Sequence, residues 1–233
     1  MPSVGTPSDF GSTPEQQNQG NEGAVPAGAV SQESSAASSP IEADVQLIVV
    51  YRPSDTHGPL RQAEVLSDVF QYRRSFLSLR AKTHELEEIQ HPYAIVMSPD
   101  CDLEQDFGSR MGKIKADKTI SDILLLQAIT VDELRATTPA GKDIWKRIRQ
   151  NKDDRYHVIE SADPQEDAIG AGLPALGIDF KRYFTVPLDE LYEQCANQTK
   201  RRCFLDSPYS EHLNRRFSDF LSRVALPREH RVD

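Results

Sequence analysis

The chain has 233 residues and a formal charge of −9 at pH 7, with 38% hydrophobic, 7% aromatic and 27% charged residues. This composition is typical of a soluble globular protein, and no apolar run reaches the roughly eighteen residues of a membrane-spanning helix, which excludes transmembrane transport. The charge is uneven: residues 1–44 hold six acidic and no basic residues, while the rest of the chain holds 27 basic and 30 acidic residues. A body so close to neutrality does not indicate bulk nucleic-acid binding.

The cysteines and the N-terminus indicate the compartment. The chain has an odd number of cysteines, namely Cys101, Cys195 and Cys203, and none of them belongs to a CxxC pair. The pattern therefore predicts neither a disulfide framework nor a zinc ribbon. The N-terminus lacks the basic start and apolar stretch of a signal peptide. We therefore expect a cytoplasmic protein with no cofactor and no membrane attachment.

Residues 1–44 are predicted to be a disordered tail. They contain eighteen Ser, Pro or Gly residues and a single aromatic residue, Phe10. Such a segment cannot bury enough apolar surface to offset the entropy of ordering. The alternative is a docking segment that folds on a partner. Residues 45–233 are expected to form a single domain.

Short apolar or β-branched runs bounded by turn-forming residues predict the strands of that domain. Two continuous apolar runs, residues 92–98 and 123–129, have the length of strands buried on both faces and are expected at the centre of the core. Residues 62–73 lack a clean period, and we favour a strand there over a helix. The other predicted strands are residues 45–51, 155–160, 179–186 and 201–205.

Three helices are predicted in the second half of the chain. One opens at Thr138-Pro139 and places Ile144, Trp145 and Ile148 on one face, and another opens at Pro187. The clearest spans residues 208–224, with Ser207 as its cap. Its expected buried stripe is Tyr209, Leu213, Phe217, Phe220, Leu221 and Val224. Strands and helices in this order predict an α+β fold.

Two strings resemble those of a known toxin family. Residues 89–98 (Ile-Gln-His-Pro-Tyr-Ala-Ile-Val-Met-Ser) run through a His-Pro pair into an apolar strand, and residues 124–130 (Leu-Leu-Leu-Gln-Ala-Ile-Thr) end an apolar strand in Ile-Thr. With the order of elements, residues 88–224 resemble the MazF/PemK growth-arrest toxins, in which a Lys-x-Arg-Pro string and an Ile-Thr string stand at these places. The resemblance implies a small SH3-like barrel with peripheral helices and a C-terminal helix.

The resemblance also implies two catalytic candidates, His91 and Thr130. In the toxins that cut RNA, the Arg of the Arg-Pro string stabilises the charge that develops on the phosphate, with the Thr beside it. His91 stands at the Arg position, where an imidazole could replace the guanidinium only with a raised pKa. The alternatives are that His91 is a turn residue before Pro92 and that Thr130 caps a helix through a box with Glu133.

Residues 98–103 place a thiol between two carboxylates directly after a predicted core strand. This stretch is therefore a candidate site loop, made of Ser98, Asp100, Cys101 and Asp102. It could supply a nucleophile, or it could bind a metal together with a distant His91 or His157. The flanking carboxylates disfavour a thiolate, and no ligand spacing supports a metal. The alternative is a turn in which the aspartates bond the local backbone while Cys101 packs as a small apolar residue.

Two basic clusters are candidate phosphate contacts. Four cations lie in the expected loop between the two core strands, which in the resembling toxins helps to hold RNA: Arg110, Lys113, Lys115 and Lys118. The second cluster is Lys200, Arg201 and Arg202. The alternative is that both are solvated faces.

We therefore predict a MazF/PemK-like barrel of bacterial or phage type that binds a protein or nucleic acid without catalysis. One alternative is a toxin-like endoribonuclease that cleaves single-stranded RNA through His91 and Thr130. A second is a metal- or thiol-dependent enzyme centred on Asp100-Cys101-Asp102. The identity of the partner and the formation of a homodimer stay open.

Overall fold

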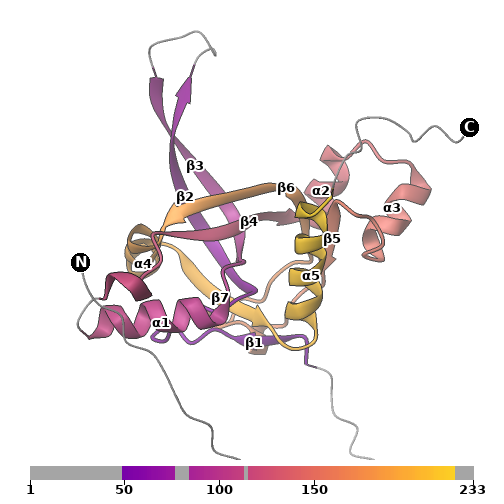
Figure 1. Cartoon of the computed structure of the whole chain (residues 1–233). Helices are drawn as coiled ribbons and strands as arrows, with labels where there is room; N and C mark the ends of the chain where they lie inside the picture. Colours follow the sequence, from indigo (N-terminus) through magenta and orange to yellow (C-terminus); the bar gives the residue numbers. More distant parts are fainter. Residues whose placement is uncertain (1–48, 77–83, 113–114, 224–233) are drawn as a thin grey trace, which may run out of the picture. The chain divides into compact units, whose positions relative to one another are not determined.

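The computed structural model describes residues 49–76, 84–112 and 115–223 (Figure 1). The predicted disordered tail, residues 1–44, lies outside the described residues. The strands are β1 (Tyr51–Pro53), β2 (Glu64–Phe76), β3 (His84–Val96), β4 (Asp122–Thr130), β5 (Tyr156–Ile159), β6 (Leu176–Pro187) and β7 (Lys200–Leu205). The helices are α1 (Asp100–Met111), α2 (Val131–Thr137), α3 (Lys142–Arg149), α4 (Leu188–Asn197) and α5 (Tyr209–Leu221), with the short 3-10 helices η1 (Ala116–Lys118) and η2 (Pro164–Glu166).

All seven strands form one antiparallel sheet in the order β1-β7-β2-β3-β4-β6-β5. The α+β class is thereby confirmed. The predicted closed barrel is wrong, because the edge strands β1 and β5 do not pair with each other. Two hydrogen bonds link the β1-β7 end of the sheet to the segment that follows β5 instead. The Tyr51 hydroxyl of β1 donates to the Glu160 carbonyl after β5 at 2.6 Å, and the Ala168 amide donates to the Arg202 carbonyl of β7 at 2.7 Å.

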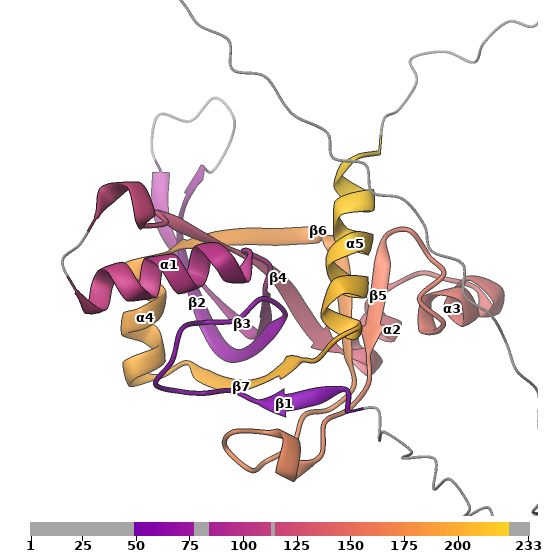
Figure 2. The same cartoon turned by 60° about the horizontal axis from the view of Figure 1, so that its bottom comes forward.

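Each face of the sheet carries an apolar cluster. Leu213 and Phe217 of α5 pack into one cluster, whereas the other contains Leu103 of α1 and Leu188 of α4. Figure 2 shows α1 and α4 together on one side and α5 apart from them. Successive residues of β3 belong to different clusters, because side chains alternate across a strand. The prediction that residues 92–98 and 123–129 form buried central strands is therefore confirmed.

Helix α1 stands where a loop was predicted. Pro99 precedes its first turn, which holds Asp100 and Asp102, and carboxylates are favourable at a helix N-terminus. Leu103 is its only buried apolar residue, so no amphipathic period is visible in the sequence. The expected loop between the two core strands is thus mostly helical.

The predicted C-terminal helix is confirmed as α5, with Leu213 and Phe217 buried. Two details were wrong: Leu221 is half exposed, and Ser207 does not cap the helix, since Pro208 occupies the N-cap position. The predicted stripe residue Val224 lies outside the described residues.

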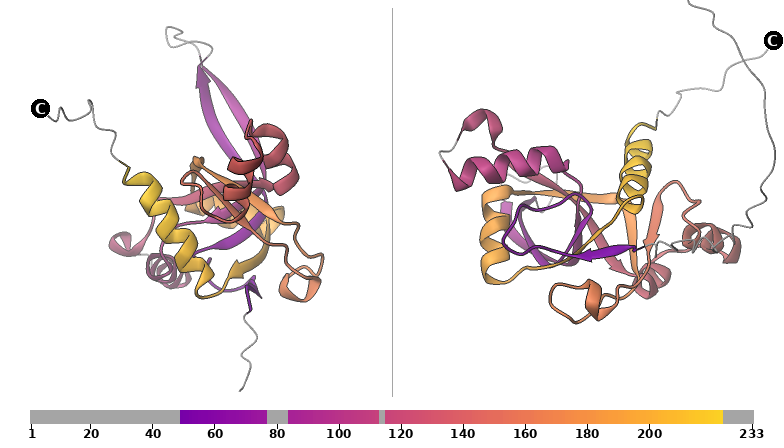
Figure 3. Two further views of the ribbon diagram at one scale, coloured as in Figure 1. Left: turned by 90° about the vertical axis from the view of Figure 1, so that its right-hand side faces the viewer. Right: turned by 90° about the horizontal axis from the view of Figure 1, so that it is seen from below.

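Strands β2 and β3 continue beyond the rest of the sheet as a two-stranded arm, defined here as residues 70–76 and 84–90. Strand β7 pairs with β2 only from Glu64 to Ser67, and β4 pairs with β3 only from Tyr93 to Val96. Farther out the two strands pair only with each other, and Figures 1 and 3 show the arm projecting from the sheet. The strand predicted over residues 62–73 is confirmed, but β3 begins at His84, well before the predicted start at residue 92.

Candidate functional site

His91 lies in the middle of β3, paired with Val69, and not in a turn. Its side chain is buried, its ring stacks on Phe184 with centroids 3.9 Å apart, and Nε2 lies 3.4 Å from the Gln71 side-chain oxygen. Burial, aided by the nearby charge of Arg73, lowers the pKa of His91 to about 4. The ring is therefore neutral at pH 7 and does not carry the positive charge that the catalytic interpretation of His91 requires.

Thr130 caps a helix, as the alternative interpretation predicted. Its hydroxyl accepts a hydrogen bond from the Glu133 amide at 3.2 Å, and the Glu133 carboxylate accepts one from the Thr130 amide at 2.9 Å. These bonds hold the pKa of Glu133 below its ordinary range. No hydrogen bond or ring contact joins Thr130 to His91 within the part of the chain that the structure describes. The two catalytic candidates each have a structural partner of their own.

In the first basic cluster, Arg110 is held in ion pairs. The Arg110 guanidinium contacts the Asp106 carboxylate at 2.5 Å and forms a second ion pair with Asp189. Lys115 and Lys118 are exposed, whereas Lys113 lies outside the described residues. Arg110 is therefore committed to tying α1 to α4 and is not free to bind a phosphate.

The candidate site loop is built into the fold. The Ser98 hydroxyl accepts a hydrogen bond from the Leu124 amide at 3.0 Å. The Asp100 carboxylate accepts from the Gln62 amide at 2.7 Å and pairs with the Arg61 guanidinium at 3.1 Å. Cys101 is exposed, with its Sγ atom 3.5 Å from the Asp102 carboxylate. Among the described residues, the thiol has a hydrogen bond only to a carboxylate, and a neighbouring carboxylate disfavours the thiolate that nucleophilic chemistry needs.

The second basic cluster is largely buried. The Arg201 guanidinium contacts the Glu64 carboxylate at 2.7 Å and 3.0 Å, and Arg202 contacts the Asp167 carboxylate at 2.9 Å and 2.7 Å. Burial acts to raise the pKa of Asp167, but the bonds from Arg202 and two backbone amides keep it below its ordinary range. Only Lys200 of this cluster is exposed. Both interpretations, a phosphate contact and a solvated face, are therefore wrong for Arg201 and Arg202.

The structure shows two features that sequence analysis missed, and the first is the outer edge of the arm. The Gln194 side chain of α4 both accepts a hydrogen bond from the Phe70 amide at 2.9 Å and donates one to the Phe70 carbonyl at 2.8 Å. Backbone groups of alternate residues point to the same side of a strand. The backbone N–H and C=O groups of Tyr72 and Arg74 therefore point to the same outer edge of β2 as those of Phe70. Among the described residues, no strand pairs with β2 at this edge.

The second feature is a cleft of about 960 Å³ bounded by α3, β5 and α5. Its lining includes His157 of β5, Trp145 of α3 and Tyr209 of α5. Cations also line it from α3: Lys142, Lys146 and Arg149. The sequence signal that could have revealed them is their spacing, which places them on one side of a helix.

Comparisons with known proteins provide no relative for this chain: no family model matches it, and neither does any curated protein or solved structure. Within the described residues, no helix is long and apolar enough to span a membrane. The same residues contain no group of three or more His, Cys, Asp or Glu side chains placed to hold a metal ion.

Proposed function

We propose that this chain is an interaction module without catalysis and that its arm binds an extended segment of a partner protein. Of the interpretations that accompany the MazF/PemK resemblance, this one agrees best with the geometry of His91. The observation that carries it is the free edge of β2 beside the exposed Tyr72 and Leu86 side chains of the same arm.

The free edge supports binding of a strand. Gln194 satisfies the outward-facing backbone groups of Phe70, and the Thr199 hydroxyl donates to the Asp68 carbonyl at 2.7 Å. Beyond these caps, the outward N–H and C=O groups of Tyr72 and Arg74 are available. An extended peptide that adds to such an edge gains main-chain hydrogen bonds without any change in the sheet.

The side chains of the arm support a protein partner. Tyr72 is 45% exposed and Leu86 is 73% exposed, and the pairs Tyr72↔Glu88 and Arg74↔Leu86 place both on one face. A two-stranded ribbon is marginally stable by itself, and a partner that covers this face removes apolar surface from water.

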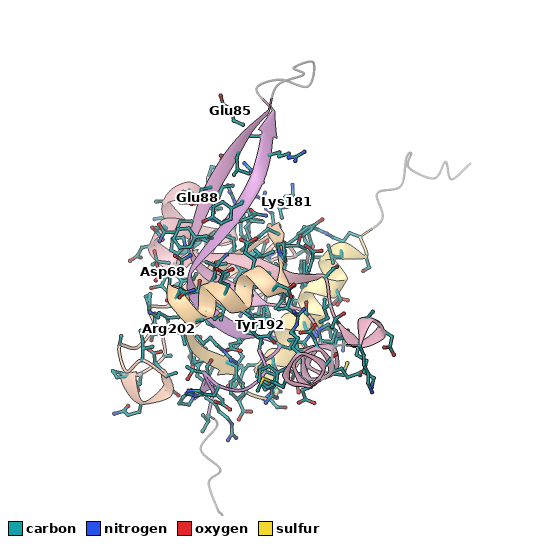
Figure 4. The ribbon with its side chains drawn as sticks, turned by 90° about the vertical axis from the view of Figure 1, so that its left-hand side faces the viewer. Asp68, Glu85, Glu88, Lys181, Tyr192 and Arg202 are labelled. Carbon is teal, nitrogen blue, oxygen red and sulfur yellow. The ribbon has the colours of Figure 1, made fainter. Side chains whose placement is uncertain are left out.

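The two strands of the arm carry charges of both signs, which suits a partner protein of mixed charge. Strand β2 contributes Arg73 and Arg74, while β3 contributes Glu85, Glu87 and Glu88. Arg73 pairs with Glu87 at 3.0 Å, which leaves more carboxylates than cations. Figure 4 shows Glu85 and Glu88 on the arm, well separated from Arg202 in the body. A partner protein with charges of both signs can complement these strands.

The absence of catalysis is tested with purified protein and a panel of single-stranded RNAs. We expect no cleavage, because the His91 ring is neutral and stacked on Phe184. Cleavage by the wild-type protein that disappears in His91→Ala, with the fold intact, would contradict this part of the proposal.

The arm is tested by replacing Leu86 with a photo-crosslinking residue in cells of the native host. We expect one discrete adduct with a partner protein, and none when the same probe replaces Ile169, which is also exposed but lies elsewhere. In the Leu86 background, Arg74→Pro removes an outward N–H and should abolish the adduct, whereas the matched Arg74→Thr should preserve it.

Three crosslinking results would contradict partner binding at the edge. They are equal adducts from Leu86 and Ile169, an adduct insensitive to Arg74→Pro, and an adduct with the mass of two copies of this chain. The last would assign the arm to a homodimer.

A further inference from the structure

The cleft between α3 and α5 is lined by His157, whose ring offers a hydrogen-bond donor. His157 is only 2% exposed, and its Nδ1 atom lies 3.0 Å from the Arg216 guanidinium. A guanidinium only donates hydrogen bonds, so Nδ1 must accept and the ring proton must lie on Nε2. Within the described part of the chain, Nε2 has no hydrogen-bond partner.

The His157 donor is uncharged under ordinary conditions. Burial, together with the neighbouring Arg216 and His212, lowers its pKa to about 3. An N–H on a ring that lines an open cleft, with no hydrogen-bond partner among the described residues, is suited to an uncharged acceptor, such as a carbonyl or ring nitrogen, on a ligand.

Cations are concentrated on the α3 wall of the cleft. Lys142, Lys146 and Arg149 are all exposed, and none forms an ion pair among the residues that the structure describes. Asp143 and Glu160 also line the cleft, so its charge is only slightly positive. This balance suits a compact anion such as one phosphate group better than a long polyanion.

An aromatic side chain lies beside these cations. The Trp145 ring borders the cleft and is partly buried, with the Arg135 guanidinium 4.7 Å from its centroid. Tyr209 lines the opposite wall from α5. A flat aromatic ring next to phosphate-binding cations is the combination that holds a nucleobase and its phosphate together.

We propose that this cleft binds a nucleotide unit, with its base against Trp145, its phosphate at Lys142, Lys146 and Arg149, and one base acceptor at the His157 Nε2–H. The unit is either a free mononucleotide or one nucleotide of a single strand. This site lies outside the arm, so it does not depend on the function proposed there.

The chain contains one Trp, which makes fluorescence a direct readout. The full chain is titrated with the four ribonucleoside monophosphates, a short single-stranded RNA and inorganic phosphate. We expect saturable quenching of Trp145 by at least one nucleotide ligand and none by inorganic phosphate. Quenching by mononucleotides would identify a free nucleotide as the ligand. Quenching by the RNA alone would identify one nucleotide of a single strand as the ligand. Both results support the site.

Variants of the cationic wall test its role. The double variant Lys146→Ala/Arg149→Ala should weaken binding about ten-fold or more, while the matched control Lys118→Ala, an exposed lysine on η1, should leave it unchanged. His157→Leu should also weaken binding, and the fraction of folded protein is measured alongside it. If His157→Leu unfolds, the double variant at the two exposed residues still gives an answer. Absence of saturable quenching by every nucleotide ligand, equal effects of inorganic phosphate, or wild-type affinity in the double variant would overturn the proposal.

Discussion

The basic residues of β7 and those of α3 behave in opposite ways although both are dense in positive charge. Arg201 and Arg202 are adjacent in a strand whose two faces are covered, so each is buried against a carboxylate. Lys146 and Arg149 lie one turn apart on a helix with an exposed side, and both remain in water. Basic residues therefore predict a binding surface only where their secondary structure leaves them exposed.

The largest effect is expected from breaking a pair in β7. Arg202→Ala leaves the Asp167 carboxylate, whose side chain has no exposed surface, without its guanidinium and should cost about 3–5 kcal/mol of unfolding free energy. The exposed Lys146→Ala should cost less than about 0.5 kcal/mol. Urea unfolding of both variants measures the contrast, and equal losses would mean that burial does not separate the two regions.

The apolar core of α5 provides a second contrast within one helix. Phe217→Ala should destabilise the protein by about 3–5 kcal/mol, because the ring packs against Phe180 in the core. Leu221→Ala, at a half-exposed position on the same helix, should cost well under that amount. Urea unfolding distinguishes them, and a small loss for Phe217→Ala would mean that this face of α5 is not part of the core.

Local sequence patterns predicted the elements that have strong local signals. A single segment reveals each of them: β3 and β4 by a continuous apolar run, the helix after Thr130 by its capping box, and α5 by its apolar stripe. Helix α1 shows no such period, and the partners of Arg201 and Arg202 are distant in sequence, so pairwise contacts made only in the fold decide their roles. For the same reason, the sequence could not predict that His91 is buried and neutral, because Phe184 and Gln71 determine its environment.

Acidification should destabilise the protein through His91. Its pKa is about 4 in the folded chain and near 6.5 when unfolded, so the unfolded state takes up the proton first as pH falls through this window. The contribution of neutral His91 to the free energy of unfolding is complete above the ordinary pKa of histidine. About 2 kcal/mol of this contribution should be lost between pH 7 and pH 5. His91→Phe, which can retain the stack on Phe184, should remove that loss from urea unfolding curves. An unchanged pH profile in this variant would show that His91 is not buried as described.

A smaller effect is expected at the cap of the arm. Gln194→Ala removes both side-chain bonds to Phe70 and should cost about 1–2 kcal/mol. Glu193→Ala, at an exposed neighbouring position of α4, is the matched control and should change stability by less than about 0.5 kcal/mol. Equal effects in thermal unfolding would indicate that the cap does not stabilise the base of the arm.

Residue-resolved amide hydrogen exchange in the free chain tests the open edge of β2 most directly. The amides of Gln71 and Arg73 face β3 and should be protected, and the Phe70 amide should be protected by Gln194. Those of Tyr72 and Arg74 should exchange much faster, because they face the outer edge, and should become protected when the partner binds. Uniform protection along β2 in the free chain would contradict the account, since it would mean that no edge is available for a partner strand.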